Sequence, residues 1–158
     1  MTNLSPAQRL AGLPPEDRLS VIEGLSHDEQ LLLLYDWPTW ARPPQIAPKW
    51  DWRVWLLLAG RGFGKTRCGA EFIRQEVDAG RAGHIALVAP TSADARDTMI
   101  EGESGLLGIY PPTQRPVYEP SKRRITFHNG ATATTFSADE PDRLRGPNHD
   151  LAWCDELA

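Results

Sequence analysis

The chain has 158 residues, about the length of one domain and enough to bury a hydrophobic core. Hydrophobic residues make up 41% of it and charged residues 24%, which excludes a largely disordered chain. With 17 basic and 21 acidic residues the formal net charge is −4, so contact with nucleic acid would need a local basic patch.

The cysteines and the N-terminus exclude other classes. Cys68 and Cys154 are far apart, which gives neither a metal-binding spacing nor a disulfide framework. The N-terminus lacks the pattern of a signal peptide, and no apolar run approaches the roughly 20 residues that span a bilayer. We therefore expect a soluble, cytoplasmic protein.

Residues 1–36 carry helix signals and form a predicted helical appendage of two short helices. Ser5-Pro6 starts the first, Pro15 starts the second, and Ser26 resembles the first residue of a capping box for the turns that follow. The apolar residues of this appendage either pack on the rest of the protein or dock another subunit.

Residues 36–53 are rich in tryptophan and proline. Such a segment cannot hold a regular helix or a central strand, so we expect an ordered loop fixed by its aromatic side chains. Gln45 has the paired donor and acceptor that an adenine edge requires. It either reads the base of a nucleotide or faces solvent.

The segment that follows, WLLLAGRGFGKTR, resembles a P-loop. We expect a buried strand over Trp55–Ala59, then a glycine-rich loop that cradles phosphates with its N–H groups, then a helix. In the pattern G-x-x-x-x-G-K-[ST] the first glycine is replaced by Ala59. Lys65 would pair with the β- and γ-phosphates, and the Thr66 hydroxyl would bind Mg²⁺. The alternative is a glycine-rich loop with a surface lysine. The predicted ATP-binding residues are Gln45, Gly60, Arg61, Gly62, Phe63, Gly64, Lys65, Thr66 and Arg67.

Helix and strand signals then alternate. We expect an amphipathic helix over 67–79 with Gly80 at its end, a parallel strand over 84–89, a helix over 93–101 capped by Ser92 or Thr91, and a loop over 102–112. The side chains of the first helix that we expect to be buried are Ala70, Phe72, Ile73 and Val77.

Asn129-Gly130 joins two alternating segments, 122–128 and 131–137, and predicts a β-hairpin. The first segment begins with three basic residues, Lys122, Arg123 and Arg124. They either meet DNA phosphates or form a solvated face.

An apolar strand over 150–154 ends in Asp155-Glu156, which fits a Walker B motif about 90 residues after the P-loop. Parallel sheets place their ligands at the carboxyl ends of strands, so Asp155 would hold Mg²⁺ through its water shell. Glu156 would orient or deprotonate the attacking water. Acidic pairs also end many strands that have no such role.

Two sets of arginines could steady charge on the transferring phosphoryl group. Arg61 lies inside the loop and could act in cis, whereas Arg143 and Arg145 precede the last strand and could act in a neighbouring subunit. The alternative for each is a surface salt bridge.

With these residues in place, the chain resembles the ATPase region of phage-type terminase large subunits, the motors that package DNA into procapsids. It looks closest to versions from α-proteobacterial phages and gene transfer agents. The resemblance covers about residues 37–158. It rests on Ala41-Arg42-Pro43-Pro44-Gln45, on Gly60-Arg61-Gly62-Phe63-Gly64-Lys65-Thr66-Arg67, on Gly69-Ala70-Glu71, and on Leu144-Arg145-Gly146-Pro147 running into Asp155-Glu156.

The resemblance implies an α/β P-loop NTPase fold with a central, mostly parallel sheet, a β-hairpin insertion and the helical appendage. It implies an ATP hydrolase whose catalytic glutamate, Glu156, lies beside Asp155. Together with the reading of the residues above, the predicted catalytic residues are Glu156, Arg61 and Arg145, with Thr66 and Asp155 at a Mg²⁺ ion. The implied partners are double-stranded DNA, a small terminase subunit, the portal of the procapsid and further copies in a ring, all in the bacterial host cytoplasm.

The resemblance also implies a nuclease domain and further C-terminal strands, which residues 37–158 do not include. We therefore expect an ATPase domain that is incomplete at its C-terminus and has no nuclease activity. Two alternatives stay open. One is a non-catalytic adaptor that docks small terminase or portal, and the other is a helicase-like ATPase fragment, because Val88-Ala89-Pro90-Thr91 resembles a helicase segment.

Overall fold

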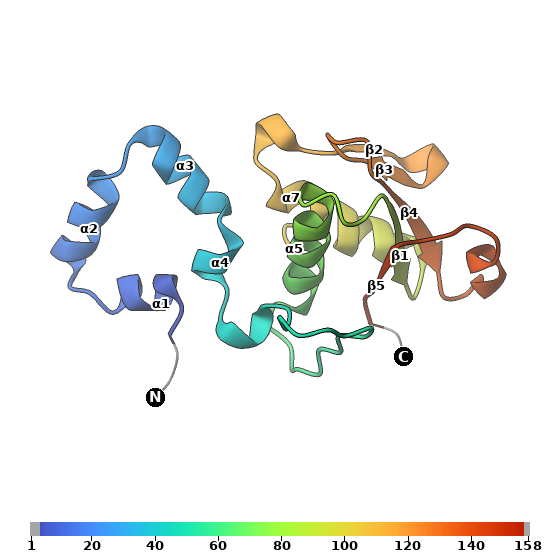
Figure 1. The fold of residues 1–158 in the computed structure, drawn as a ribbon, viewed down its shortest axis with the longest axis horizontal. Coiled ribbons are helices and arrows are strands. Elements are labelled where there is room, and N and C mark those ends of the chain that lie inside the picture. The colour runs from blue at the N-terminus through green and yellow to red at the C-terminus, as the bar shows by residue number, and fades with distance from the viewer. Residues whose placement is uncertain (1–3, 157–158) are drawn as a thin grey trace. The chain divides into compact units, whose positions relative to one another are not determined.

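The computed structural model describes residues 4–156. It divides the chain into two compact units, Met1–Leu57 and Leu58–Ala158. Figure 1 shows the helices of the first unit in blue and cyan, and the sheet and helices of the second unit in green to red.

The first unit is built from short helices, and three of them lie where two were predicted. The capping box at Ser26 is confirmed and starts the third: the Ser26 Oγ accepts the Glu29 N–H at 3.3 Å, and the Glu29 carboxylate accepts the Ser26 N–H at 2.8 Å. None of α1, α2 and α3 contains a buried residue. The helices of this unit are α1 (Pro6–Ala11), α2 (Pro15–Glu23), α3 (His27–Tyr35), α4 (Trp37–Trp40) and the 3₁₀ turn η1 (Pro43–Gln45).

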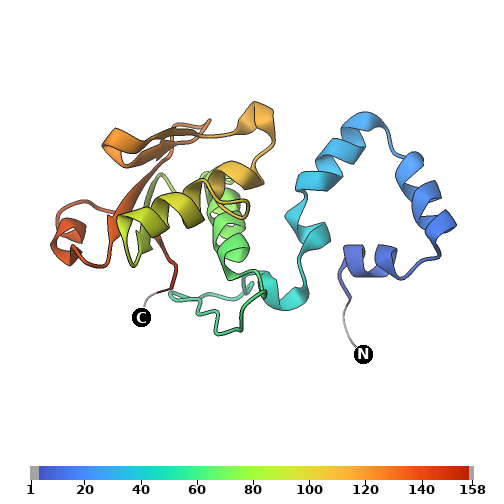
Figure 2. The same cartoon turned by 180° about the vertical axis from the view of Figure 1, so that it is seen from behind.

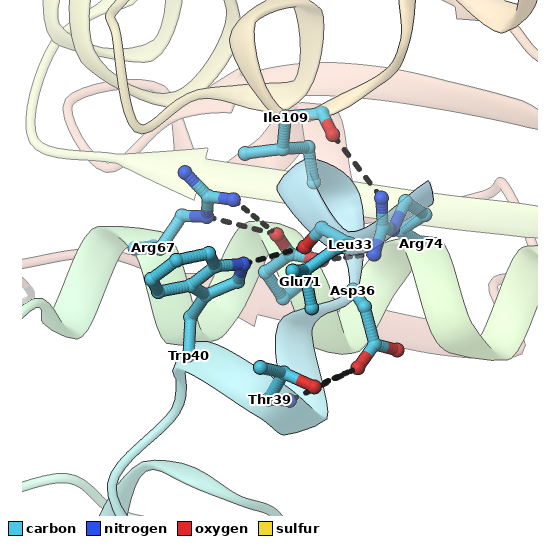
Figure 3. Close-up of polar contacts among 8 residues, drawn as sticks. All are labelled: Leu33, Asp36, Thr39, Trp40, Arg67, Glu71, Arg74 and Ile109. Atoms are coloured by element: carbon cyan, nitrogen blue, oxygen red, sulfur yellow. Dashed lines mark hydrogen bonds and ion pairs between the residues drawn. The ribbon is translucent and has the colours of Figure 1, made fainter. Parts of the chain in front are cut away.

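The tryptophan- and proline-rich segment forms an ordered loop with two short turns, as predicted. Asp36 caps α4 by accepting the Thr39 N–H at 3.1 Å and the Thr39 hydroxyl. The Trp40 indole N–H donates to the Leu33 carbonyl at 2.6 Å (Figure 3). The polar N–H of the Trp40 ring is therefore hydrogen-bonded to a backbone carbonyl. The prolines of this segment prevent a longer helix.

The second unit contains a five-stranded mixed sheet with the order β2-β3-β4-β1-β5. β1 pairs in parallel with both β4 and β5, whereas β2 with β3 and β3 with β4 are antiparallel. The predicted mostly parallel sheet is therefore mixed, because the hairpin pairs within the same sheet. The strands are β1 (His84–Ala89), β2 (Val117–Glu119), β3 (Arg124–Thr126), β4 (Thr132–Ser137) and β5 (Leu151–Cys154).

The predicted hairpin is confirmed, and its turn is fastened to a helix. Phe127 N–H donates to the Ala131 carbonyl at 2.9 Å, and Gly130 has φ +87°, which favours glycine. The Asn129 side chain donates to the Val77 carbonyl at 2.7 Å. β2, which extends the sheet beyond the hairpin, was not predicted.

Helices cover one face of this sheet. Ile85 and Leu87 of β1 share a core with Ala70, Ile73 and Val77 of α5. Of the predicted buried set of α5, Phe72 is only half-buried, and Gly80 follows its end with φ +68°. As predicted, Thr91 caps the next helix, α6. That helix continues directly as the π-helix η2. The helices are α5 (Lys65–Asp78), α6 (Ser92–Asp94), η2 (Ala95–Ile100), α7 (Leu106–Ile109) and the 3₁₀ turns η3 (Pro112–Gln114), η4 (Pro120–Lys122) and η5 (Pro141–Leu144).

The opposite face of the sheet has a smaller core of Ala86, Val88 and Phe136. His149 meets the Phe136 ring edge-on at 5.3 Å between centroids. The loop between β4 and β5 lies on the far side of β1 and β4 from α5 (Figures 1 and 2). Within residues 4–156, no helix has the length and apolar character needed to cross a membrane.

The buried strand predicted over Trp55–Ala59 is wrong. This segment has no strand pairing, and Leu56 and Leu58 are 70% and 85% exposed. A strand needs a neighbour to receive its backbone hydrogen bonds. In the described part of the chain this segment pairs with no strand, and β5 has β1 as its only strand neighbour.

Candidate functional site

The glycine-rich loop makes a tight turn directly before α5. Gly62 and Gly64 have φ +76° and +90°, a region that side chains other than glycine rarely enter. Phe63 N–H reaches back to the Gly60 carbonyl at 3.4 Å. A Cβ atom at Gly60 or Gly62 would meet nothing within 4 Å, so this side of the loop is open to a ligand.

Lys65, the first residue of α5, folds back over the loop. Its Nζ donates to the Ala59 carbonyl at 2.9 Å and to the Gly60 carbonyl at 3.3 Å. Both acceptors are neutral, whereas an ammonium group binds an anionic oxygen about twice as strongly. The lysine ammonium group therefore lies against the backbone of the glycine-rich loop.

Thr66 and Asp155, 89 residues apart, meet across the second unit. The Thr66 hydroxyl donates to Asp155 Oδ2 at 3.0 Å. Thr66 lies in the first turn of α5, and Asp155 follows β5 directly. Asp155 is 9% exposed, and burial raises the pKa of its carboxyl group, while the hydrogen bond from Thr66 opposes that rise.

Glu156 is exposed and has φ +50°. Non-glycine residues rarely take this conformation, and where it occurs it is often part of a functional site. The charge of Glu156 also raises the pKa of Asp155, and the charge of Lys65 lowers it. Thr66, Glu156 and Lys65 thus each influence the Asp155 carboxyl group at the end of β5.

Arg67 takes part in an ion-pair cluster around Glu71, a buried carboxylate for which no role was predicted. Arg67 and Arg74 lie 2.7 and 2.8 Å from the two Glu71 oxygens, and Arg74 also donates to the Ile109 carbonyl at 3.1 Å (Figure 3). The signal was the spacing of these charges at i, i+4 and i+3 on a helix. The cluster joins α5 to α7.

The other predicted site residues lie in exposed or locally paired positions. Arg61 is exposed in the loop. Arg145 pairs with Asp142 at 3.2 Å, and both side chains are 84% exposed. Gln45 belongs to the first unit and is buried, and its Oε1 accepts the Arg42 backbone N–H at 2.8 Å.

The basic residues of the hairpin all have acidic partners. Lys122 and Arg124 lie 2.6 and 3.0 Å from Glu119, and Arg123 lies 3.5 Å from Glu140. This pairing matches the interpretation of a solvated, charge-compensated face.

The donors near Asp155 fit a hard cation. Mg²⁺ prefers oxygen ligands, keeps several waters, and is usually bound by one or two carboxylates together with substrate phosphates. Thr66 and Asp155 supply a hydroxyl and a carboxylate oxygen side by side. Residues 4–156 contain no group of three or more His, Cys, Asp or Glu side chains that could hold a metal ion.

Residues 56–158 match the sequence profile of one protein family, described as terminase large subunit, T4likevirus-type, N-terminal. Comparisons with curated proteins and with solved structures gave no match.

Proposed function

Because the chain belongs to the terminase large-subunit family, whose members are generally ATPases that act in DNA packaging, we propose that residues 58–158 bind Mg·ATP as part of a DNA-packaging motor. In this proposal the second unit has a P-loop NTPase fold. Double-stranded DNA, a small terminase, a portal and further copies of the chain in a ring are its partners.

The loop and the start of α5 would hold the triphosphate. Backbone N–H groups from Gly60 to Thr66 and the positive end of the α5 dipole favour a bound anion. Lys65 would exchange its two neutral carbonyl acceptors for phosphate oxygens.

The acidic pair would complete the site. Thr66 and Asp155 would bind Mg²⁺, Asp155 through water, and the metal would neutralise charge on the phosphates. Glu156 would orient the attacking water. Arg61 in cis, or Arg145 from a neighbouring copy, would stabilise charge on the transferring group.

The observation that carries this proposal is the 3.0 Å hydrogen bond between Thr66 and Asp155. It joins a glycine-rich loop to an acidic pair at the end of a strand, and each motif alone occurs in proteins without a nucleotide. Their proximity supports the proposal that the loop would hold a phosphate beside a carboxylate that would bind the metal.

Equilibrium binding of a fluorescent ATP analogue in Mg²⁺ tests the proposal. We expect saturable binding by the unaltered chain and a loss of affinity of up to about 100-fold in Lys65→Ala, because a charge-assisted contact to phosphate is worth up to about 3 kcal/mol. Lys122→Ala, which removes a lysine paired with Glu119, is the matched control and should bind normally. Equal affinity in Lys65→Ala would contradict the proposal.

A non-catalytic adaptor is the second candidate, and the surface of the first unit favours it. Leu19, Leu32 and Leu34 are 58%, 72% and 58% exposed on helices that contain no buried residue. Such apolar exposure is typical of surfaces that bind other proteins. Absence of nucleotide binding by the unaltered chain would favour the adaptor.

A further inference from the structure

Gly69 and Trp153 make an unusually close contact between α5 and β5. A Cβ atom at position 69 would lie 2.3 Å from both Cε2 and Nε1 of the Trp153 indole, and 2.8 Å from Cζ2. Ordinary contacts of a Cβ atom begin near 3.4 Å. The indole therefore occupies the space that any side chain at position 69 would need.

This contact and the Thr66–Asp155 hydrogen bond belong to the same helix–strand interface. Gly69 follows Thr66 by three residues, so both lie on one face of α5. Trp153 precedes Asp155 by two residues, and the Asp155 N–H continues the pairing with β1 by donating to the Val88 carbonyl at 2.9 Å, so both side chains lie on the same side of the chain. The ring is 8% exposed and belongs to the main core of the second unit.

Glycine at this position is not explained by helix formation. Gly69 lies inside α5, where glycine is less favourable than alanine because it loses more backbone freedom on folding. Its conformation needs no glycine either, since Gly69 is absent from the residues of positive φ. The remaining explanation for glycine at position 69 is that the Trp153 indole occupies the space of a side chain there.

We propose that Gly69 and Trp153 are positioning residues for the metal site: the indole over Gly69 sets the distance between α5 and β5 that brings the Thr66 hydroxyl to the Asp155 carboxylate. This inference rests on the proposed Mg·ATP site. A methyl group at position 69 would need roughly one ångström more room. A displacement of that size between reacting groups can lower the reaction rate about 100-fold.

The test measures how strongly Mg²⁺ improves binding of a fluorescent ATP analogue. In Gly69→Ala we expect this improvement to fall about 10- to 100-fold, the range for loss of groups that orient a metal ligand. Affinity in EDTA, which depends on the loop and Lys65, should stay within about threefold. Gly12→Ala is the matched control, because its added Cβ meets atoms only at 3.4 and 3.5 Å.

The double variant Gly69→Ala/Trp153→Leu separates positioning from a general loss of stability. A smaller side chain at 153 makes room for the methyl group, so the double variant should recover part of the Mg²⁺ effect that Gly69→Ala loses. An unchanged Mg²⁺ effect in Gly69→Ala, or losses in the two single variants that simply add, would overturn the inference. If the unaltered chain itself shows no Mg²⁺-dependent binding, the proposed function fails and this inference fails with it.

Discussion

At the scale of single residues, the account depends on a few oxygen and nitrogen atoms at one end of the sheet. Lys65, Thr66, Asp155 and Glu156 could be selected from the sequence because their motifs state both the residue type and the spacing that phosphate and metal require. The Gly69–Trp153 contact could not, because the fold brings its atoms together. The spacing of Glu71 from Arg67 and Arg74 suggests an ion pair, but no local pattern shows that the carboxylate is buried. Arg67, selected as a nucleotide ligand, forms an ion pair with Glu71.

Asp155→Asn tests the metal half of the site. The substitution keeps the size of the side chain but removes the negative charge, so we expect Mg²⁺ to improve nucleotide binding about 10- to 100-fold less than in the unaltered chain. Titration of Mg²⁺ at a fixed concentration of ATP analogue measures this. Asp142→Asn, at a residue 84% exposed, is the control. Equal Mg²⁺ titrations for Asp155→Asn and the unaltered chain would show that Asp155 has no part in metal binding.

At the scale of elements, the sequence predicted those with a local cause and missed those without one. A few neighbouring residues are enough to predict the Asn-Gly turn, the apolar strand β1 and the Ser26 capping box. The segment 55–59 has the composition of a strand, but a strand also needs a partner, and in the described residues it has none. β2 is three residues long and pairs only with β3, so no local pattern marked it.

Asp150 links the start of β1 to the start of β5 through hydrogen bonds. These bonds predict how the stability of the fold depends on pH. Its Oδ2 accepts the Gly83 and His84 N–H groups at 2.9 and 2.8 Å, and these hydrogen bonds lower its pKa below the ordinary 3.8. At pH values above the pKa of the unfolded chain, the ionised Asp150 carboxylate stabilises the fold. This stabilisation is lost as the pH falls through the lower pKa that Asp150 has in the folded protein. We therefore expect Asp150→Ala to lower the free energy of unfolding at pH 7 and to have little effect near pH 2.

Urea unfolding of both proteins at pH 7, 4 and 2 measures this difference. Asp139→Ala provides a control carboxylate that lies on the loop after β4. A stability difference for Asp150→Ala that is as large at pH 2 as at pH 7 would show that the carboxylate charge does not support the junction.

At the scale of the whole molecule, the chain comprises two compact units joined near residue 57. Both the family assignment and the α/β class of the second unit were predicted, and both are confirmed, although the sheet is mixed. The predicted boundary between an appendage of residues 1–36 and an ATPase domain of residues 37–158 stays a prediction. Composition alone marks such a boundary poorly, because the tryptophan-rich segment is as apolar as a core.

Limited proteolysis should find the junction between the units. Residues 51–60 have no helix or strand, and Val54, Leu56 and Leu58 are 81%, 70% and 85% exposed. Exposed segments without backbone pairing are preferred sites of cleavage. We expect chymotrypsin to cut first between residues 50 and 58 and to leave a fragment that contains the sheet, as mass spectrometry would show. A first cut within α5 or β4 would contradict the division into units.

The most direct test of the central claim is a crystal structure of the chain with a slowly hydrolysed ATP analogue and Mn²⁺, which replaces Mg²⁺ and scatters anomalously. The proposed site predicts one Mn²⁺ peak bound by the Thr66 hydroxyl and linked to the Asp155 carboxylate through water, with the triphosphate over residues 60–66 and the Lys65 ammonium group on its oxygens. A nucleotide bound elsewhere, or a metal far from Asp155, would contradict it.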